Sequence, residues 1–179
     1  GSVKLRKDKI YLKGTLRSLA SSFEFVAKQK QIDFQMFFPE KELEIFTYPD
    51  ALQKIIMNLL GNAFKYTPDS GSVHFSIDVR SSQLYMEIKN TGSGIEPSKL
   101  QQIFTRFYQT NPVADGLGIG LALVKELAER MNGKITVDSV PGEWTTFRLN
   151  YPIEVLHDNI KFSSDKLTKS ISEELTSKL

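Results

Sequence analysis

Cysteine is missing from this 179-residue sequence, which excludes disulfide bridges, thiolate metal sites and a cysteine nucleophile. Long hydrophobic runs are missing as well: the longest span three or four residues, whereas a membrane-crossing helix needs roughly 18. No apolar segment of the signal-peptide kind stands near the N-terminus. We therefore expect a domain that works in the cytoplasm.

An excess of charge of one sign is also lacking. The 23 Lys and Arg residues nearly balance the 21 Asp and Glu residues, and the net charge is +2. This balance gives no electrostatic reason for a nucleic acid partner, and we expect none. Hydrophobic residues make up 40% and charged residues 25% of the chain. That composition excludes collagen-like and wholly disordered classes and is typical of one globular domain.

The spacing of apolar residues predicts strands and helices along the chain. Strands are expected at 8–14, 32–38, 43–48, 73–79, 84–90, 134–139 and 144–151, with 73–79 and 84–90 forming a hairpin. Helices are expected at 15–30, 50–66, 97–104 and 119–131, and a loop at 108–117. No internal repeat is evident.

The composition changes at both ends of this pattern. Residues 1–7 read as a leader that begins with the Gly-Ser scar of an expression tag, and we expect an excised fragment. From Ile153 the chain is rich in Ser, Thr, Lys and Glu, so we place the domain at 8–152. In the tail at 153–179, apolar residues recur every four positions, which predicts a modest amphipathic helix. The tail is either a frayed end or a connector to another domain.

The helix expected at 50–66 carries an unusual polar face. Asn58, Asn62 and Lys65 stand at i, i+4 and i+7 and share one side, with Tyr66 beside them. Asparagine is a mediocre helix former, so two of them one turn apart need a reason. One interpretation is ordinary solvated polarity. The other is that the carboxamide oxygens bind a hard cation such as Mg²⁺ while Lys65 meets phosphate.

Two glycine clusters follow predicted elements. The stretch 92–94 (Gly-Ser-Gly) comes after a strand whose last residue, Asn90, has the parity of the buried face and so needs a polar partner. The stretch 116–120 (Gly-Leu-Gly-Ile-Gly) opens the helix at 119–131, where backbone N–H groups can approach phosphate oxygens closely. It is neither a P-loop nor a Rossmann fingerprint, because the following Lys-Ser/Thr and the preceding strand are missing.

These segments form an ordered series: N-L-L-G-N-A-F-K-Y-T at 58–67, N-T-G-S-G-I at 90–95, I-F-T-R-F-Y at 103–108 and G-L-G-I-G-L-A-L at 116–123. The series resembles the N, G1, F and G2 boxes of the ATP-binding domain of sensor histidine kinases, within the wider GHKL group. The resemblance covers about residues 10–152. It implies a two-layer α/β sandwich of the Bergerat type, with a mixed, mostly antiparallel sheet covered on one face by helices.

The resemblance also implies roles for individual residues. Asn62 matches the metal-ligating Asn, and Asn58 lies one turn earlier on the same face. Lys65 matches the phosphate-contacting Lys, and Tyr66 the aromatic that lies against the nucleotide. The G1 glycines approach adenine, the F-box hydrophobics dock a lid, and the G2 glycines hinge that lid and face the phosphates. The implied ATP-binding set is Asn58, Asn62, Lys65, Tyr66, Asn90, Gly92, Gly94, Ile95, Phe104, Phe107, Tyr108, Gly116, Gly118, Gly120 and Leu121, with Asn62 as the metal ligand and ATP and Mg²⁺ as cofactors.

Three positions depart from the family's usual pattern. Asn90 stands where the family usually has the Asp that accepts a hydrogen bond from the adenine amine. Gln109 stands where many members have an Arg, which weakens the expectation of one γ-phosphate contact. Trp144 stands where the family often has Gly, and we expect that change to affect packing only.

A phosphoacceptor histidine is not evident. His74 lies on the outward face of its strand and His157 in the tail, and neither has the H-E-x-x-x-P surroundings typical of the family. We therefore expect a domain that donates the γ-phosphoryl group of Mg·ATP to a His on a separate dimerisation domain. The resemblance also implies a response regulator or receiver domain as a partner and a membrane-anchored parent protein.

Two other functions stay open. One is another GHKL branch, either a Ser kinase of the anti-sigma type or a water-using ATPase. The water-using branches carry a Glu base where this chain has Asn58, whose carboxamide is no base. The other is a degenerate GHKL module that binds partners and little or no ATP, for which Asn90 and Gln109 are the evidence.

Overall fold

Two β-sheets organise the part of the chain that the computed structural model describes, residues 5–108 and 118–158. The larger sheet has the strand order β2-β4-β5-β7-β6, with β2 parallel to β4 and the other neighbours antiparallel. Its strands are β2 (Asp33–Phe37), β4 (Ser72–Arg80), β5 (Gln83–Thr91), β6 (Lys134–Val140) and β7 (Trp144–Pro152). The smaller sheet is antiparallel, in the order β1-β3-β8, and consists of β1 (Asp8–Tyr11), β3 (Leu43–Thr47) and β8 (Glu154–Asp158).

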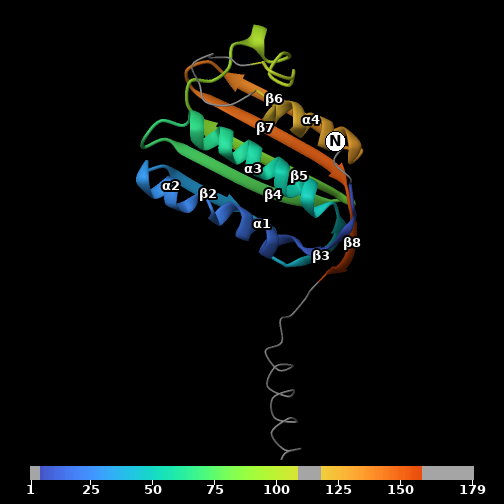
Figure 1. Ribbon diagram of the computed structural model, residues 1–179. Helices are drawn as coiled ribbons and strands as arrows, with labels where there is room; N and C mark the ends of the chain where they lie inside the picture. The colour runs from blue at the N-terminus through green and yellow to red at the C-terminus, as the bar shows by residue number, and fades with distance from the viewer. Residues whose placement is uncertain (1–4, 109–117, 159–179) are drawn as a thin grey trace, which may run out of the picture.

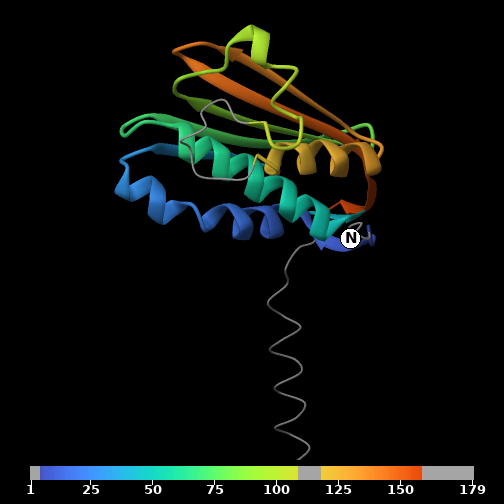
Figure 2. The ribbon, with the colours of Figure 1, turned by 45° about the horizontal axis from the view of Figure 1, so that its top comes forward.

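The helices form a layer on one face of the larger sheet (Figures 1 and 2). They are α1 (Leu12–Ser21), α2 (Glu24–Gln29), α3 (Pro49–Tyr66) and α4 (Gly120–Arg130), and a short 3₁₀ turn, η1 (Pro97–Lys99), follows β5. Both views place α3 across the middle of the sheet with α4 beside it. This is the predicted two-layer sandwich, with a mixed and mostly antiparallel sheet.

The core fills the space between the two layers. In β4, Val73, Phe75 and Ile77 are buried and alternate with half-buried polar residues, as the period of a one-sided sheet requires. Helix α3 meets them with a stripe of apolar residues, namely Leu52, Ile55, Ile56, Leu59, Leu60 and Ala63. Pro49 at its first turn suits a helix start, because proline lacks only an N–H that would have no partner there. The described part of the chain contains no helix of membrane-spanning length and hydropathy.

The N-terminal segment differs from the prediction of a strand at 8–14 and one helix at 15–30. The strand ends at Tyr11, and α1 starts at once because the Glu42 carboxylate accepts hydrogen bonds from the backbone N–H groups of Lys13 and Gly14, at 2.7 and 2.8 Å. The helix then breaks after Ser21. The hydroxyls of Ser21 and Ser22 donate hydrogen bonds of 2.8 Å each to the carbonyl oxygens three residues earlier. These bonds compete with the backbone hydrogen bonds that would continue the helix.

The fold also continues past the predicted domain end near Pro152. Ile153 is buried, and β8 pairs with β3 as an edge strand of the smaller sheet. His157 therefore lies in a strand, opposite Glu44, and not in a tail. The polar composition concealed this strand, because an edge strand has one solvated face and reads much like a loop. Residues 159–179, with the predicted amphipathic helix, lie outside the described residues.

The predicted helix at 97–104 is also shorter than expected. Only Pro97–Lys99 forms a 3₁₀ turn, and residues 100–107 continue as successive turns. His74, by contrast, lies on the uncovered face of the larger sheet as predicted, half-buried and edge-on to Phe37 with 6.2 Å between ring centroids.

Candidate functional site

The polar face of α3 meets the start of α4. Asn58 is half-buried, and its Nδ2 donates a hydrogen bond of 2.7 Å to the Lys54 carbonyl. Its Oδ1 consequently faces Gly120, where an added Cβ would overlap that oxygen. Asn62 lies one turn further along α3, also half-buried. Any larger residue at position 120 would displace the Asn58 carboxamide.

The N-terminus of α4 has features of an anion site. Its N-cap residue, Ile119, makes no side-chain hydrogen bond to the helix, and no acidic residue stands in the first turn. The backbone N–H groups there point out of the helix at its positive end. Gly118 has φ +65°, and an added Cβ would come within 2.8 Å of the Tyr108 carbonyl oxygen. Leu121 is half-buried in the first turn. The predicted site residue Gly116 and the departure Gln109 fall outside the described residues.

Asn90 lies on the buried face of β5, as its strand parity predicted. It is 5% exposed, and its Nδ2 donates a 3.0 Å hydrogen bond to the Thr91 carbonyl. Thr145 stands opposite it on β7 and is likewise buried. The Ser139 hydroxyl lies 2.9 Å from the Thr145 hydroxyl and accepts a 2.8 Å bond from the Ile95 N–H. The Ser139–Thr145 pair was not predicted from the sequence, although Thr145 lies on the buried face of its strand as Asn90 does.

Both glycines of the 92–94 stretch are required by close backbone contacts. Gly92 has φ +154°, and a Cβ there would overlap the Tyr66 carbonyl oxygen at the end of α3. Gly94 has φ +64°, and a Cβ there would overlap the Val140 carbonyl oxygen at the end of β6. The stretch is thus held against α3 on one side and against the β6–β7 turn on the other.

The F-box residues divide into an anchored and an exposed part. Phe104 is half-buried and lies edge-on to Phe147 of the sheet, with 6.3 Å between ring centroids. Phe107 is 73% exposed and has φ +65°. Its N–H donates a 2.9 Å bond to the Gly118 carbonyl, which links the end of this segment to the start of α4. Tyr108 is half-buried.

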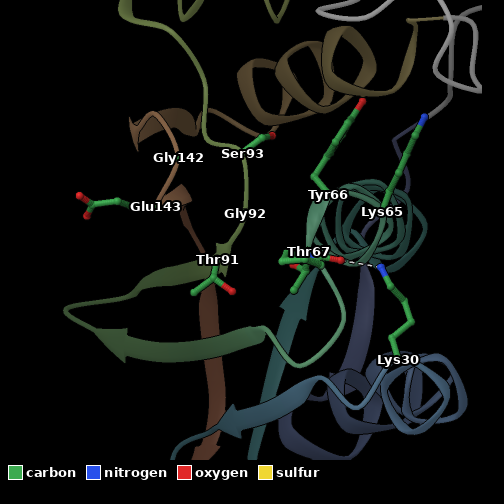
Figure 3. Close-up of a pocket in the computed structure, with 10 residues that line it drawn as sticks. Lys30, Lys65, Tyr66, Thr67, Thr91, Gly92, Ser93, Gly142 and Glu143 are labelled. Carbon is green, nitrogen blue, oxygen red and sulfur yellow. Dashed lines mark hydrogen bonds between the residues drawn. The ribbon is translucent and has the colours of Figure 1, made fainter.

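A pocket of about 660 Å³ lies beside the C-terminal end of α3 (Figure 3). Lys65 and Tyr66 leave the helix end in the same direction there, with the Lys65 ammonium 5.4 Å from the centroid of the Tyr66 ring. From the opposite side, Lys30 reaches Thr67. The pocket is lined by Lys30, Lys65, Tyr66, Thr67, Pro68, Thr91, Gly92, Ser93, Gly142 and Glu143. Lys30 and Thr67 were not predicted as site residues, because single polar residues at element ends give no pattern.

Comparison with family models matches residues 47–155 to the histidine kinase-, DNA gyrase B- and HSP90-like ATPases. The chain belongs to this family. The matched range contains α3, the G1 and F boxes and α4, and so every residue of the site described above except Lys30. The resemblance inferred from the four boxes is thereby confirmed.

Curated relatives of this ATPase domain are sensor kinases. Sensor histidine kinase WalK of Bacillus subtilis (strain 168) is 32% identical over 133 residues, which cover 71% of this chain. Hybrid signal transduction histidine kinase D of Dictyostelium discoideum is 29% identical over 97% of this chain. The chain spans 22% of the length of the first relative and 12% of the second.

Solved structures agree with this assignment. Full-length ShkA in complex with AMPPNP has a TM-score of 0.77 and 27% identity, covering 87% of this chain and 33% of ShkA. The nucleotide-free catalytic domain of histidine kinase ThkA has a TM-score of 0.74 over 83% of this chain and 96% of its own. At 21% identity, the ThkA comparison shows the shared fold alone. Together with the family match and the sensor-kinase relatives, the shared fold makes this chain an ATPase domain of the histidine kinase type.

Proposed function

We propose that this chain binds Mg·ATP and donates the γ-phosphoryl group to a His on a separate dimerisation domain of a two-component sensor kinase. The observation that carries the proposal is the contact between the Asn58 side chain and Gly120, which sets the polar face of α3 against the N-terminus of α4, whose N-cap residue makes no side-chain hydrogen bond to the helix. A triphosphate between them would meet backbone N–H donors from α4 and side chains from α3. The AMPPNP in the ShkA structure supports the same ligand class.

The residues present fit a magnesium ion that is bound partly by the nucleotide. Asn62 would be the protein ligand, since a carboxamide oxygen is the hard donor that Mg²⁺ accepts. No group of three or more His, Asp or Glu side chains able to hold a metal occurs among the described residues. This suits an ion that takes its other ligands from phosphate and water. When bound, the ion would supply positive charge against the triphosphate.

The remaining residues would position the nucleotide, which is most of what phosphoryl transfer needs from a protein. Lys65 would contact phosphate and Tyr66 would lie against the base. Asn90 would face the adenine edge from the buried end of β5, where the two G1 glycines allow close approach. In the whole kinase, a response regulator or receiver domain would take the phosphoryl group next. We also propose that the parent protein is membrane-anchored, with this domain in the cytoplasm.

A degenerate module that binds partners without ATP is the less favoured alternative. The four boxes lie close together in the described residues: Gly120 lies against Asn58 in the middle of α3, Gly92 against Tyr66 at its end, and the Phe107 N–H bonds to Gly118. This proximity supports nucleotide binding. A water-using ATPase is disfavoured for a chemical reason: Asn58 donates its amide to Lys54 and has no carboxylate to act as a base.

Phosphoryl transfer in trans tests the proposal. The chain alone, incubated with Mg²⁺ and ATP labelled in the γ-phosphate, should incorporate no stable label. Addition of the parent protein's dimerisation domain should produce acid-labile phosphohistidine on that domain, slowly because no tether raises the effective concentration. The Lys65→Ala variant should lower this transfer. Stable label on the chain itself, or steady phosphate release that Lys65→Ala abolishes, would instead favour another GHKL branch.

A further inference from the structure

We propose that Lys30 is a positioning residue for the base end of the nucleotide site, although it lies outside all four boxes. Its ammonium holds the C-terminal turn of α3, from which Lys65 and Tyr66 project. The inference rests on the proposed ATP-binding function and deepens it, because it names a residue that acts on the geometry of the site through the end of α3.

The Lys30 ammonium bonds to the end of α3. Its Nζ donates to the carbonyl oxygens of Phe64, at 3.0 Å, and Thr67, at 2.5 Å, and the side chain is half-buried. The last carbonyls of a helix have no intrahelical donor, and a cation there also meets the negative end of the helix dipole. The Ala63 carbonyl already receives bonds from the Thr67 N–H at 3.0 Å and the Thr67 hydroxyl at 2.6 Å. Lys30 thus supplies donors that the turn needs from outside the helix.

The backbone of Lys30 holds the segment that follows this turn. Its carbonyl oxygen accepts a 2.9 Å hydrogen bond from the Ser70 N–H. At the start of β2, the Asp33 N–H donates a 2.9 Å hydrogen bond to the carbonyl of Gly71, the residue before β4, and the two strands begin to pair there. The chain around Lys30 therefore contacts the loop at 67–71 through side chain and backbone together. This fixes the ammonium relative to the sheet, and through it the end of α3.

The turn that Lys30 holds is part of the site. Lys65 and Tyr66 lie between the two carbonyls that bind the ammonium, and their side chains point away from Lys30 (Figure 3). The Tyr66 carbonyl oxygen also lies against Gly92, so that the position of this turn sets how closely the G1 stretch approaches α3. A small displacement of the turn would move the base-contacting Tyr66 and Gly92 together, while the face formed by Asn58 and Asn62 lies earlier in the helix.

The test compares Lys30→Met, which removes the charge and the donors, with Lys30→Arg, which keeps both. Lys28→Met is the matched control, because Lys28 is an exposed lysine in the last turn of α2, the helix whose C-cap is Lys30. Binding of ATP with Mg²⁺, of adenosine, and of pyrophosphate with Mg²⁺ is measured by titration. Thermal unfolding and the amide NMR signals of Tyr66, Thr67 and Gly92 are recorded on each free protein.

Lys30→Met should weaken both ATP and adenosine about fivefold, the order expected when a charged hydrogen bond that fixes a contact is lost. It should weaken pyrophosphate less, because Lys65 is the one proposed phosphate-binding residue on the turn that Lys30 holds. It should also shift the three amide signals, and Lys30→Arg should largely restore binding and signals. The proposal is wrong if Lys30→Met binds ATP and adenosine as Lys28→Met does, or if all three ligands weaken equally. If the wild-type chain binds no ATP, the proposed function fails, and unchanged amide signals in Lys30→Met would separately overturn the structural role of Lys30.

Discussion

At the scale of single residues, Asn90 is the departure from the usual family pattern that changes hydrogen bonding most directly, because it replaces an Asp. A carboxylate only accepts hydrogen bonds, whereas a carboxamide both accepts and donates. In this chain the amide is used locally, since Nδ2 donates to the Thr91 carbonyl from a side chain that is almost fully buried. Asn90 can thus accept from the adenine amine, but without the charge assistance of an Asp, and its NH₂ could donate to the guanine carbonyl.

Asn90→Asp should therefore tighten ATP about fivefold, equivalent to about 1 kcal/mol, and widen the preference for ATP over GTP. The same change should lower the free energy of unfolding by about 1 kcal/mol, because the bond to the Thr91 carbonyl is lost. Calorimetric titration of both nucleotides at constant Mg²⁺ measures the first effect, with Asn150→Asp on the uncovered sheet face as the control. An unchanged ATP affinity and ATP/GTP ratio would mean that Asn90 does not contact the base.

Tyr151 is a second residue with a specific physical role, in stability and not in binding. Its side chain is fully buried, and its hydroxyl lies 3.0 Å from that of Thr47, so it connects β7 of the larger sheet to β3 of the smaller one. Burial raises the pKa of the Tyr151 hydroxyl well above its usual value of 10.0, opposed by the hydrogen bond with Thr47. The folded protein therefore holds this proton more tightly than the unfolded chain.

The raised pKa makes a signed prediction. The contribution of the Tyr151 hydroxyl to the free energy of unfolding is fully present below about pH 10, its pKa in the unfolded chain. It decreases as the pH rises from there towards the pKa in the folded state. Tyr151→Phe should cost about 1–2 kcal/mol at neutral pH, because the buried Thr47 hydroxyl loses its partner. Between about pH 9 and pH 11, however, it should lose less stability than the wild type. Urea unfolding at about pH 9 and pH 11 of the wild type, Tyr151→Phe and the exposed control Tyr85→Phe measures this difference. The same loss of stability with pH in all three proteins would contradict the prediction.

At the scale of elements, the contact between α3 and α4 sets the geometry of the proposed phosphate-binding end of the site. Gly120→Ala should weaken ATP about fivefold, because the new methyl group displaces the Asn58 carboxamide. Gly61→Ala is the matched substitution within α3, where an added Cβ meets nothing within 4 Å in the described part of the chain. It should raise stability by about 0.5–1 kcal/mol and leave ATP affinity unchanged. Equal ATP affinity in the two variants would mean that the contact between Asn58 and Gly120 does not matter for ATP binding.

The elements also show where local sequence patterns are sufficient. The β4–β5 hairpin and α3 were predicted closely, because one apolar face repeats through each of them. The break between α1 and α2 was not, since two serine hydroxyls decide it, and the early start of α1 depends on Glu42, 28 residues away from Gly14. The strand β8 was missed because its partner, β3, precedes it by more than a hundred residues. Such tertiary contacts leave no periodic signal.

At the scale of the whole molecule, the same division holds for the site. The N-box face, the buried Asn90 and the glycine stretches were all recognisable in sequence, because each depends on local geometry or on strand parity. Lys30 and the Ser139–Thr145 pair were not, because they become site neighbours only when α2 and the ends of β6 and β7 meet α3 and β5. The residues proposed to bind the nucleotide can thus be recognised from local sequence, whereas the contacts that position them depend on the tertiary fold.

The most direct test of the central claim is a calorimetric titration of ATP into the whole chain, with Mg²⁺ and then with EDTA in its place. Wild-type protein should bind ATP only when Mg²⁺ is present. Asn62→Ala should weaken that binding at least about tenfold, because it removes the proposed metal ligand, whereas the exposed Gln53→Ala on the same helix should bind like wild type. Binding by Asn62→Ala that equals wild type, or wild-type binding that is indifferent to Mg²⁺, would contradict the account of this site.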